Sequence, residues 1–149
     1  MPNKLKLSQK VLLKIKPAPN FTWRELACHD GTGYIEGLMK YEGLSFYRAW
    51  RRGRKLGKYL EAIRRKVRKP IKVTSAYRTP AYNRKIGGKS NSPHLRGYAA
   101  DMDTPPGMTT SNFAVPCRKI YPSGIGIYPS QGFVHGDFDP VLGRRNWHE

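Results

Sequence analysis

Residues 92–101 read Ser92-Pro93-His94-Leu95-Arg96-Gly97-Tyr98-Ala99-Ala100-Asp101, and residues 133–137 read Phe133-Val134-His135-Gly136-Asp137. Two histidines and an aspartate are the ligand types that hold a catalytic zinc ion while leaving its fourth position open to water. Residues 98–103 and 133–138 both have the composition of short buried strands. If His94, Asp101 and His135 meet in space, the chain is a hydrolase that uses metal-bound water.

The alternation of side chains along a strand favours such a meeting. Asp101 shares one strand face with Ala99 and Asp103, and His135 shares one with Phe133 and Asp137. If the two strands lie in one sheet, Asp101 and His135 point into a common cleft, and His94 on the preceding loop closes over it. A single histidine is more often structural than a ligand. The prediction therefore depends on the three residues occurring together.

The rest of the pattern predicts a small α+β domain in which helices flank an antiparallel sheet. Apolar residues with the spacing of an amphipathic helix precede Pro70, namely Leu56, Leu60, Ile63 and Val67. Residues 71–75 alternate like a half-buried strand. A short helix follows, with Thr79 as its cap, Pro80 in its first turn and glycines at 87 and 88 beyond its end.

The C-terminal third predicts further sheet. Residues 124–128 and 133–138 read as a β-hairpin, and residues 112–120 read as a helix broken at Pro116. At 149 residues the chain is expected to form one domain. We divide it into a basic N-terminal lead-in, residues 1–20, and a domain, residues 21–149, that carries the candidate metal ligands. Residues 21–26 predict a short helix capped by Thr22, whereas residues 31–53 give no clear pattern.

The charge is strongly unbalanced. Lys and Arg total 28 against 10 Asp and Glu, a net charge of +18. Residues 1–24 contain no acid, and Glu61 is the sole acid in residues 48–69. Such a field attracts polyanions, whether nucleic acid, anionic lipid or a bacterial wall rich in phosphate and carboxylate. The charge alone does not choose among them, and a basic face that only keeps the protein soluble is an alternative.

The sequence also bears on location. No apolar run approaches the length of a membrane span. The run at residues 11–16 is interrupted by Lys14 and Lys16, and no small-residue cleavage site follows, so no clear signal peptide is present. We therefore expect synthesis in the cytoplasm, with another route to any substrate outside it. Cys28 and Cys117 are expected to be two buried free thiols, with a disulfide between them left open.

Several motifs occur in a specific order: Ser75-Ala76-Tyr77-Arg78-Thr79, Tyr82-Asn83, Gly87-Gly88, residues 92–101, Gly124-x-Gly126-x-Tyr128 and Phe133-Val134-His135. This order resembles the zinc D-Ala-D-Ala carboxypeptidase family of murein peptidases, in its branch with a C-terminal Phe-Val-His. Vancomycin-resistance dipeptidases and phage endolysin peptidases are similar, and the hedgehog signalling domain shares the wider fold. The resemblance runs from about Phe21 to Trp147. It implies that His94, Asp101 and His135 bind one zinc ion.

The resemblance also implies roles for neighbouring residues. Arg78 is expected to face the site, where its permanent charge stabilises a developing oxyanion or anchors a substrate carboxylate. Ser92 and Tyr77 are expected to contact substrate, and Ser92 also to brace the ligand loop.

The general base is left open. Related enzymes often carry an acid three residues before the second histidine ligand, or a histidine two before it, but Gly132 and Phe133 stand there. Asp137 is the first candidate for the base, and the alternative is that it orients a ligand imidazole. His148 and His29 are weaker candidates.

The implied function is a zinc metallopeptidase that hydrolyses peptide bonds in peptidoglycan stems or cross-links. It would act as a D-Ala-D-Ala carboxypeptidase or as an endopeptidase, with a phage or prophage lysin as one context. The basic surface is expected to bind anionic cell-wall polymer. The alternatives are a non-hydrolytic zinc-containing wall-binding module and a basic nucleic-acid binding protein. Residues 56–69 with Tyr47, Trp50 and Tyr59 could serve the latter, although no nucleic-acid fold signature occurs.

Overall fold

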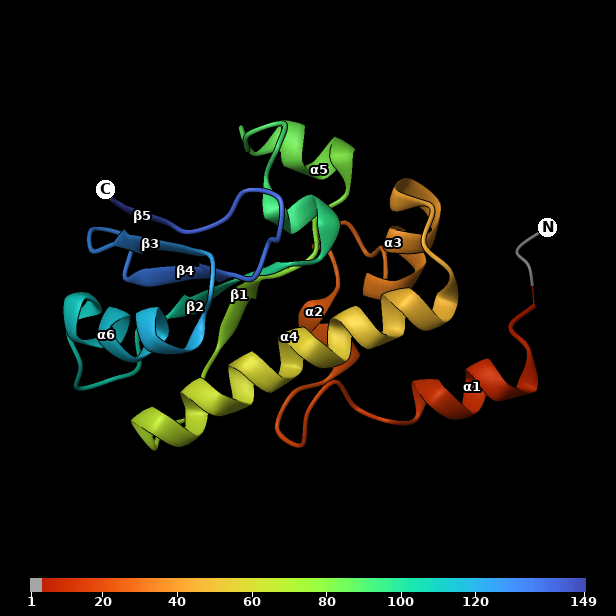
Figure 1. Ribbon diagram of the computed structural model, residues 1–149, viewed down its shortest axis with the longest axis horizontal. Coiled ribbons are helices and arrows are strands. Elements are labelled where there is room, and N and C mark those ends of the chain that lie inside the picture. Colours follow the sequence, from red (N-terminus) through yellow and green to blue (C-terminus); the bar gives the residue numbers. More distant parts are fainter. Residues whose placement is uncertain (1–3) are drawn as a thin grey trace.

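A five-stranded mixed sheet forms the centre of the protein (Figure 1). The computed structural model describes residues 4–149. The strands lie in the order β1-β2-β4-β3-β5. Their bounds are Val73–Ser75 for β1, Ala99–Asp103 for β2, Gly124–Tyr128 for β3, Phe133–Asp137 for β4 and Arg145–His148 for β5.

The helices are α1 (Leu7–Leu13), α2 (Trp23–Leu26), α3 (Tyr34–Glu42), α4 (Phe46–Val67), α5 (Pro80–Lys85) and α6 (Thr110–Ile120), with a 3₁₀ turn η1 (Pro93–Arg96). Helix α6 packs against β3 and β4, and the long helix α4 packs against α6 (Figure 1). Apolar side chains that the sheet presents to these helices, such as Met102, Ile125 and Val134, are fully buried. The opposite sheet face is therefore free to carry polar residues.

The predicted α+β class is confirmed, and so is the antiparallel pairing of the strands expected to carry the ligands. Strand β2 pairs antiparallel with β4, which in turn pairs antiparallel with β3. The fifth strand differs from expectation, because β5 pairs parallel with β3 and was not predicted. The chain crosses from β4 to the far edge of β3 through residues 138–144, and this long-range pairing leaves no local pattern in the sequence.

Helix α4 is longer than the apolar periodicity indicated, because it begins at Phe46. Gly53 and Gly57 lie near the middle of this helix, and glycine normally weakens a helix. A side chain at Gly57 would collide with the main chain of Pro17, and one at Gly53 would collide with the Trp23 ring. The glycines therefore permit close packing. Helix α6 also differs, since it continues unbroken through Pro116, where Phe113, Ala114 and Cys117 are buried in the core.

The N-terminal lead-in contains a helix that was not predicted, α1. Two tryptophan side chains tie it to the body: Nε1 of Trp50 donates to the Leu12 carbonyl at 3.0 Å, and Nε1 of Trp23 donates to the Ile15 carbonyl at 2.9 Å. Residues 1–3 of the predicted lead-in lie outside the described residues. Cys28 and Cys117 are both free and buried, as expected. Within residues 4–149, the helices are too short or too polar for any of them to span a membrane.

Candidate metal centre

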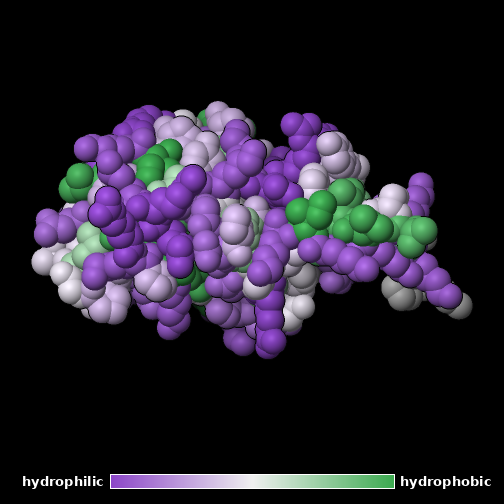
Figure 2. Space-filling model, turned by 90° about the horizontal axis from the view of Figure 1, so that it is seen from below, coloured by the Kyte–Doolittle hydropathy of each residue, from purple (hydrophilic) through white to green (hydrophobic). Residues whose placement is uncertain are grey.

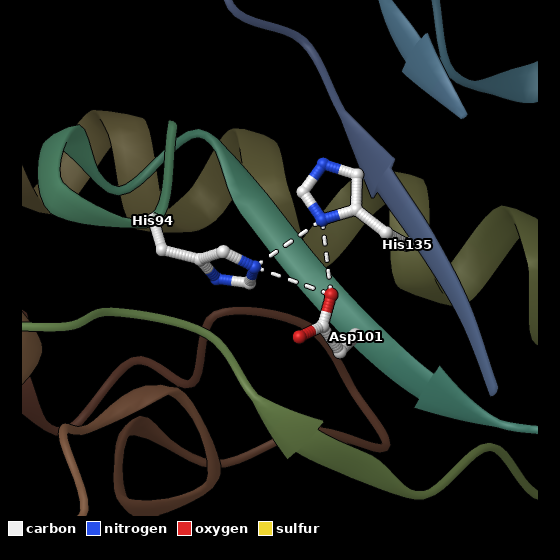
Figure 3. A group of neighbouring side chains, drawn as sticks. All are labelled: His94, Asp101 and His135. Carbon is white, nitrogen blue, oxygen red and sulfur yellow. Dashed lines mark hydrogen bonds and ion pairs between the residues drawn. The ribbon is translucent and has the colours of Figure 1, made fainter. Parts of the chain in front are cut away.

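Three potential metal ligands meet on the sheet face that lies opposite α6. Asp101 in β2 stands directly across from His135 in β4, and His94 comes from η1, which precedes β2 (Figure 3). One ligand atom from each of the three residues lies within 4.8 Å of the others. All three side chains are buried. The structure thus brings together the residues that the sequence singled out.

The His94 ring is oriented by the main chain of the segment after β1. Its Nδ1 lies 2.6 Å from the carbonyl oxygen of Ala76, so this nitrogen carries the proton and donates it. The lone pair is therefore on Nε2, which lies 3.2 Å from Oδ1 of Asp101. The hydroxyl of Ser92 caps η1 by accepting a hydrogen bond from the His94 amide at 3.3 Å. Ser92 thus contacts the turn that carries His94.

The His135 ring is oriented by a carboxylate. Its Nε2 lies 2.8 Å from Oδ2 of Asp137, so that nitrogen is the donor. Its Nδ1 faces the other two ligands, at 2.9 Å from Oδ1 of Asp101 and 3.2 Å from Nε2 of His94. A histidine whose second nitrogen donates to a carboxylate is a common arrangement in metal sites, where the carboxylate fixes the tautomer and strengthens the ligand.

The donor set fits a divalent cation. With their other nitrogens committed to Ala76 and Asp137, both imidazoles direct a lone pair toward the same carboxylate oxygen. Three acceptors this close repel one another unless a proton or a cation lies among them. Two imidazoles and one carboxylate are the protein ligands of an open tetrahedral zinc site. His94, Asp101 and His135 could therefore hold zinc.

Burial and charge set the ionisation of the group. Burial is the largest cause of a lowered pKa of His94, and the Asp101 carboxylate acts in the opposite direction. Burial acts the same way on His135, but hydrogen bonds and charges from Asp101 and Asp137 outweigh it and raise the pKa of His135. Burial opposes ionisation of Asp101, yet the two histidines hold its pKa far below the usual range. Asp101 is therefore an anion, as a metal ligand must be.

Arg78 reaches the same centre from the end of β1. Its Nη2 lies 2.9 Å from Oδ2 of Asp101, the carboxylate oxygen that faces away from the histidines. Its Nε donates to the Ser75 hydroxyl at 3.0 Å. The guanidinium is mostly buried and lines the cavity at the site. Arg78 therefore lies at the cavity wall beside Asp101.

A cavity of about 800 Å³ opens over the three ligands. Ser92 is among its lining residues, whereas Tyr77 is not. The Tyr77 ring is buried next to Gly37, whose missing side chain makes room for it, and it packs edge-on against Tyr34. The geometry therefore supports a place for Ser92 at the site and gives Tyr77 a role in the core.

Asp137 lies behind His135 and does not line the cavity. Its side chain is fully buried. Besides His135, it accepts hydrogen bonds from the Gly124 and Asp139 amides at 3.1 and 3.2 Å and pairs with Arg145 at 2.7 Å. Burial opposes its ionisation, but these donors hold the pKa of Asp137 below its usual value. Of the two roles considered for Asp137, the contacts match the orientation of an imidazole.

The sequence analysis missed two residues of β5 that complete the site. Arg145 pairs with Asp137, and the Trp147 ring packs 5.1 Å from the His135 ring, centroid to centroid. Both residues also line the cavity. The available signal was Gly124-x-Gly126, since a side chain at Gly124 would collide with Asp137 and one at Gly126 with Trp147.

One tyrosine, Tyr128, and one carboxylate, Asp101, line the cavity. Nε1 of Trp147 donates to the Tyr128 hydroxyl at 2.8 Å, and Tyr128 stands at the cavity wall. Among the described residues that line the cavity, Asp101 is the sole acid. His29 and His148, the weaker candidates for the base, do not line it either. His29 instead bonds the Thr74 carbonyl at 2.6 Å.

Comparison with known proteins agrees with this geometry. The model of a family described as Peptidase M15 matches residues 19–137. Peptidoglycan L,D-endopeptidase MepK of Escherichia coli is 31% identical over 86 residues, and the MepK of Shigella flexneri matches to the same extent. The alignment covers 54% of this chain and 45% of each relative. The chain thus spans about half the length of the curated relatives that it matches.

Proposed function

Because this chain belongs to the peptidase M15 family, we propose that it is a zinc-dependent peptidase that hydrolyses peptide bonds in bacterial peptidoglycan. The observation that carries the proposal is the convergence of His94, Asp101 and His135 within 4.8 Å under an open cavity. Each imidazole has its second nitrogen hydrogen-bonded, which leaves one lone pair directed at the centre. This is a prepared ligand set and not a chance contact between histidines.

A bound zinc ion would supply a water molecule of near-neutral pKa and a Lewis acid for the scissile carbonyl. The protein supplies the geometry. Ala76 and Asp137 fix the tautomers of His94 and His135, so that neither ring has to rotate when the ion enters. The three ligand side chains are buried, which strengthens the charge interactions among them.

Arg78 is the second catalytic group that we propose. Its guanidinium keeps its charge at all working pH values and stands at the cavity wall beside Asp101. It binds a negatively charged group. This group is either the oxyanion that develops on the attacked carbonyl or the carboxylate of a peptide stem. Its bonds to Asp101 and Ser75 hold the charge in place before substrate arrives.

We propose that Asp137 is a positioning residue and not the general base. It acts through His135, because full burial and four hydrogen-bond donors leave it out of the cavity. Proton transfer from the attacking water then uses a group that lines the cavity. Asp101 is the sole carboxylate among the described lining residues, and its bond to Arg78 and its lowered pKa make it a weak base.

The bond that is cut follows from the relatives. Their printed name describes an L,D-endopeptidase of peptidoglycan, so we propose an internal bond of the peptide cross-link. Removal of a terminal D-Ala is the alternative, because Arg78, Lys89 and Arg145 line the cavity and could hold a free carboxylate. The place of action would be the cell wall, after synthesis in the cytoplasm, and a phage or prophage lysin is one setting for such a protein.

The test is digestion of purified peptidoglycan, with and without a chelator. The proposal expects release of peptide fragments that the chelator stops and added zinc restores, and mass spectrometry of the fragments identifies the bond. Binding to the wall without release of fragments, at full zinc loading, would instead establish the non-hydrolytic wall-binding module. His148→Ala is a suitable control protein, since His148 is exposed and outside the cavity.

A further inference from the structure

A second hollow, of about 870 Å³, runs along one side of α4. We call it the basic groove and define it by its six cationic lining residues, Arg48, Arg51, Arg52, Arg54, Lys55 and Lys58. It shares no lining residue with the metal cavity. Seen from below, the molecule is covered mostly by hydrophilic side chains, and an apolar group lies toward the end that carries α1 (Figure 2). Because the two hollows share no lining residue, the basic groove is a surface separate from the metal cavity.

The positive charge of the groove is uncompensated. No acidic residue among residues 4–149 lines it. Two nearby acids are committed elsewhere, since Asp139 pairs with Arg96 and Glu61 accepts a hydrogen bond from the Asn20 side chain at 2.6 Å. Within residues 4–149, none of the six cations of the groove forms a salt bridge, and Nε of Arg54 is buried with no hydrogen-bond partner. The groove therefore presents six cations that have no acidic partner among the described residues.

Aromatic rings hold these cations in place. The guanidinium carbon of Arg52 lies 4.2 Å from the centroid of the Tyr98 ring, and that of Arg54 lies 5.2 Å from Trp50. The ammonium of Lys55 lies 5.4 Å from the Phe138 ring centroid. Such contacts order long side chains that would otherwise be mobile. They also cover part of the ring surface that would be needed to stack nucleobases, and Tyr47, at 54% exposed, is the most open ring of the groove.

We propose that the basic groove binds a phosphodiester polymer of the bacterial cell wall whose repeating unit is a polyol. A row of ordered, unpaired cations suits an anion that repeats along a chain. A polyol phosphate needs no stacking surface, whereas single-stranded nucleic acid gains much of its affinity from open aromatic faces. The covered rings therefore favour the polyol polymer. This inference builds on the proposed function, since it supplies the means by which a wall peptidase stays on its substrate.

The groove is connected to the metal centre through η1. Nη1 of Arg52 donates to the Arg96 carbonyl at 2.9 Å, and Arg96 belongs to the same turn as the ligand His94. A polymer in the groove would thus lie beside the turn that carries one metal ligand. Binding there would hold the catalytic cavity close to the wall without occupying it.

The test compares two variants of equal charge. The groove variant carries Arg51→Gln, Lys55→Gln and Lys58→Gln, and the control carries Arg65→Gln, Lys66→Gln and Lys119→Gln. All six residues are exposed, so folding is expected to persist. The probe is labelled poly(glycerol phosphate). The groove variant should lose about tenfold or more in affinity, and the slope of log affinity against log salt should become shallower by about two, because three phosphate contacts are removed. The control should lose much less.

Two outcomes would overturn the proposal. Equal losses in both variants would mean that the overall field attracts the polymer and the groove does not. Tighter binding of a single-stranded oligonucleotide of equal charge, lost in the groove variant alone, would assign the groove to nucleic acid. A third readout links binding to activity: the groove variant should digest soluble peptide fragments normally but intact polymer-bearing walls slowly, with the deficit abolished when the polymer is stripped off. If the unaltered protein releases no peptide, the proposed function fails, while the binding comparison still decides the role of the groove.

Discussion

Asp137 and Asp101 contact opposite nitrogens of the same ring, His135, at 2.8 Å and 2.9 Å. The Asp137 contact fixes which nitrogen carries the proton, and the lone pair of the other is thereby directed at the metal centre. Asp137 is itself held by Arg145 and by the Gly124 amide. Residues of three strands, β3, β4 and β5, thus orient the His135 imidazole.

Substitution of Asp137 tests this arrangement. Asp137→Asn should lower zinc affinity about 10- to 100-fold, because the amide no longer favours the tautomer with the proton on Nε2. Zinc affinity is measured by competition with a chromophoric chelator. If Asp137 were the general base, zinc affinity would be unchanged and the turnover number alone would fall. Asp103→Asn is the control. Asp103 stands on the same face of β2 as Asp101, but it pairs with the exposed Lys72.

Loss of any metal ligand should abolish zinc binding. His94→Ala, Asp101→Ala and His135→Ala each remove one of the three protein donors, so bound zinc measured by atomic emission should fall from one per chain toward zero. The unaltered protein should also be stabilised by added zinc, by about 2.7 kcal/mol when free zinc is roughly 100 times its Kd. Thermal unfolding with and without chelator measures this difference. Full zinc binding by any of the three variants would contradict the assigned ligand set.

Substitution of Arg78 should separate catalysis from metal binding. Arg78→Gln keeps a hydrogen-bond donor near Asp101 but removes the positive charge, so kcat should fall about 10²- to 10³-fold if the guanidinium stabilises the oxyanion. Zinc content should remain at one ion per chain. A rise in KM with kcat unchanged would assign Arg78 to the binding of a substrate carboxylate. An exposed arginine of α5, in the variant Arg84→Gln, is the matched control.

The stability of the protein at low pH should depend on Asp30. Hydrogen bonds from the Thr79 hydroxyl at 2.6 Å and the Thr32 amide at 2.9 Å lower the pKa of Asp30 to about 2. A depressed folded pKa stabilises the native state above the pKa of the unfolded chain, and this contribution is lost as pH falls toward 2. Asp30→Asn should therefore destabilise the protein at pH 7 but not at pH 2.

Urea unfolding of both proteins at several pH values checks this prediction. Asp30 is exposed, so water screens its interactions and the difference should be small. A difference in unfolding free energy that does not change between pH 7 and pH 2 would show that the charge of Asp30 is unimportant. Thr79 also caps α5, because its hydroxyl accepts a hydrogen bond from the Tyr82 amide. The Asp30→Asn variant therefore also reports on the stability of α5, the helix that follows Arg78.

The strand faces of Asp101 and His135 could be predicted from the sequence because they depend on local rules. Strand alternation placed Asp101 and His135 on facing positions once their strands paired, and the observed register pairs them directly. The cap at Thr79 and the proline after it likewise marked the start of α5. Such features are determined by residues within a few positions of one another, so a pattern along the chain is enough to predict them.

Other parts of the site depend on residues that are close only in the folded chain. The parallel pairing of β5 with β3 brings Trp147 to His135 and Arg145 to Asp137. The sequence around residue 145 has no local pattern that predicts this pairing. Helix α4 was predicted only from Leu56 onward, because the residues up to Gly53 gave no clear pattern and tertiary packing stabilises that part of the helix.

The sequence alone therefore determined which residue types could bind a metal and on which strand faces they stand. Only the tertiary structure decided that Asp137 lies behind His135, that Tyr77 belongs to the core, and that the cations of α4 line a groove with aromatic partners. The physical reason is that burial and hydrogen-bond partnership arise from contacts between distant segments. Those contacts form only when the sheet and its helices have assembled.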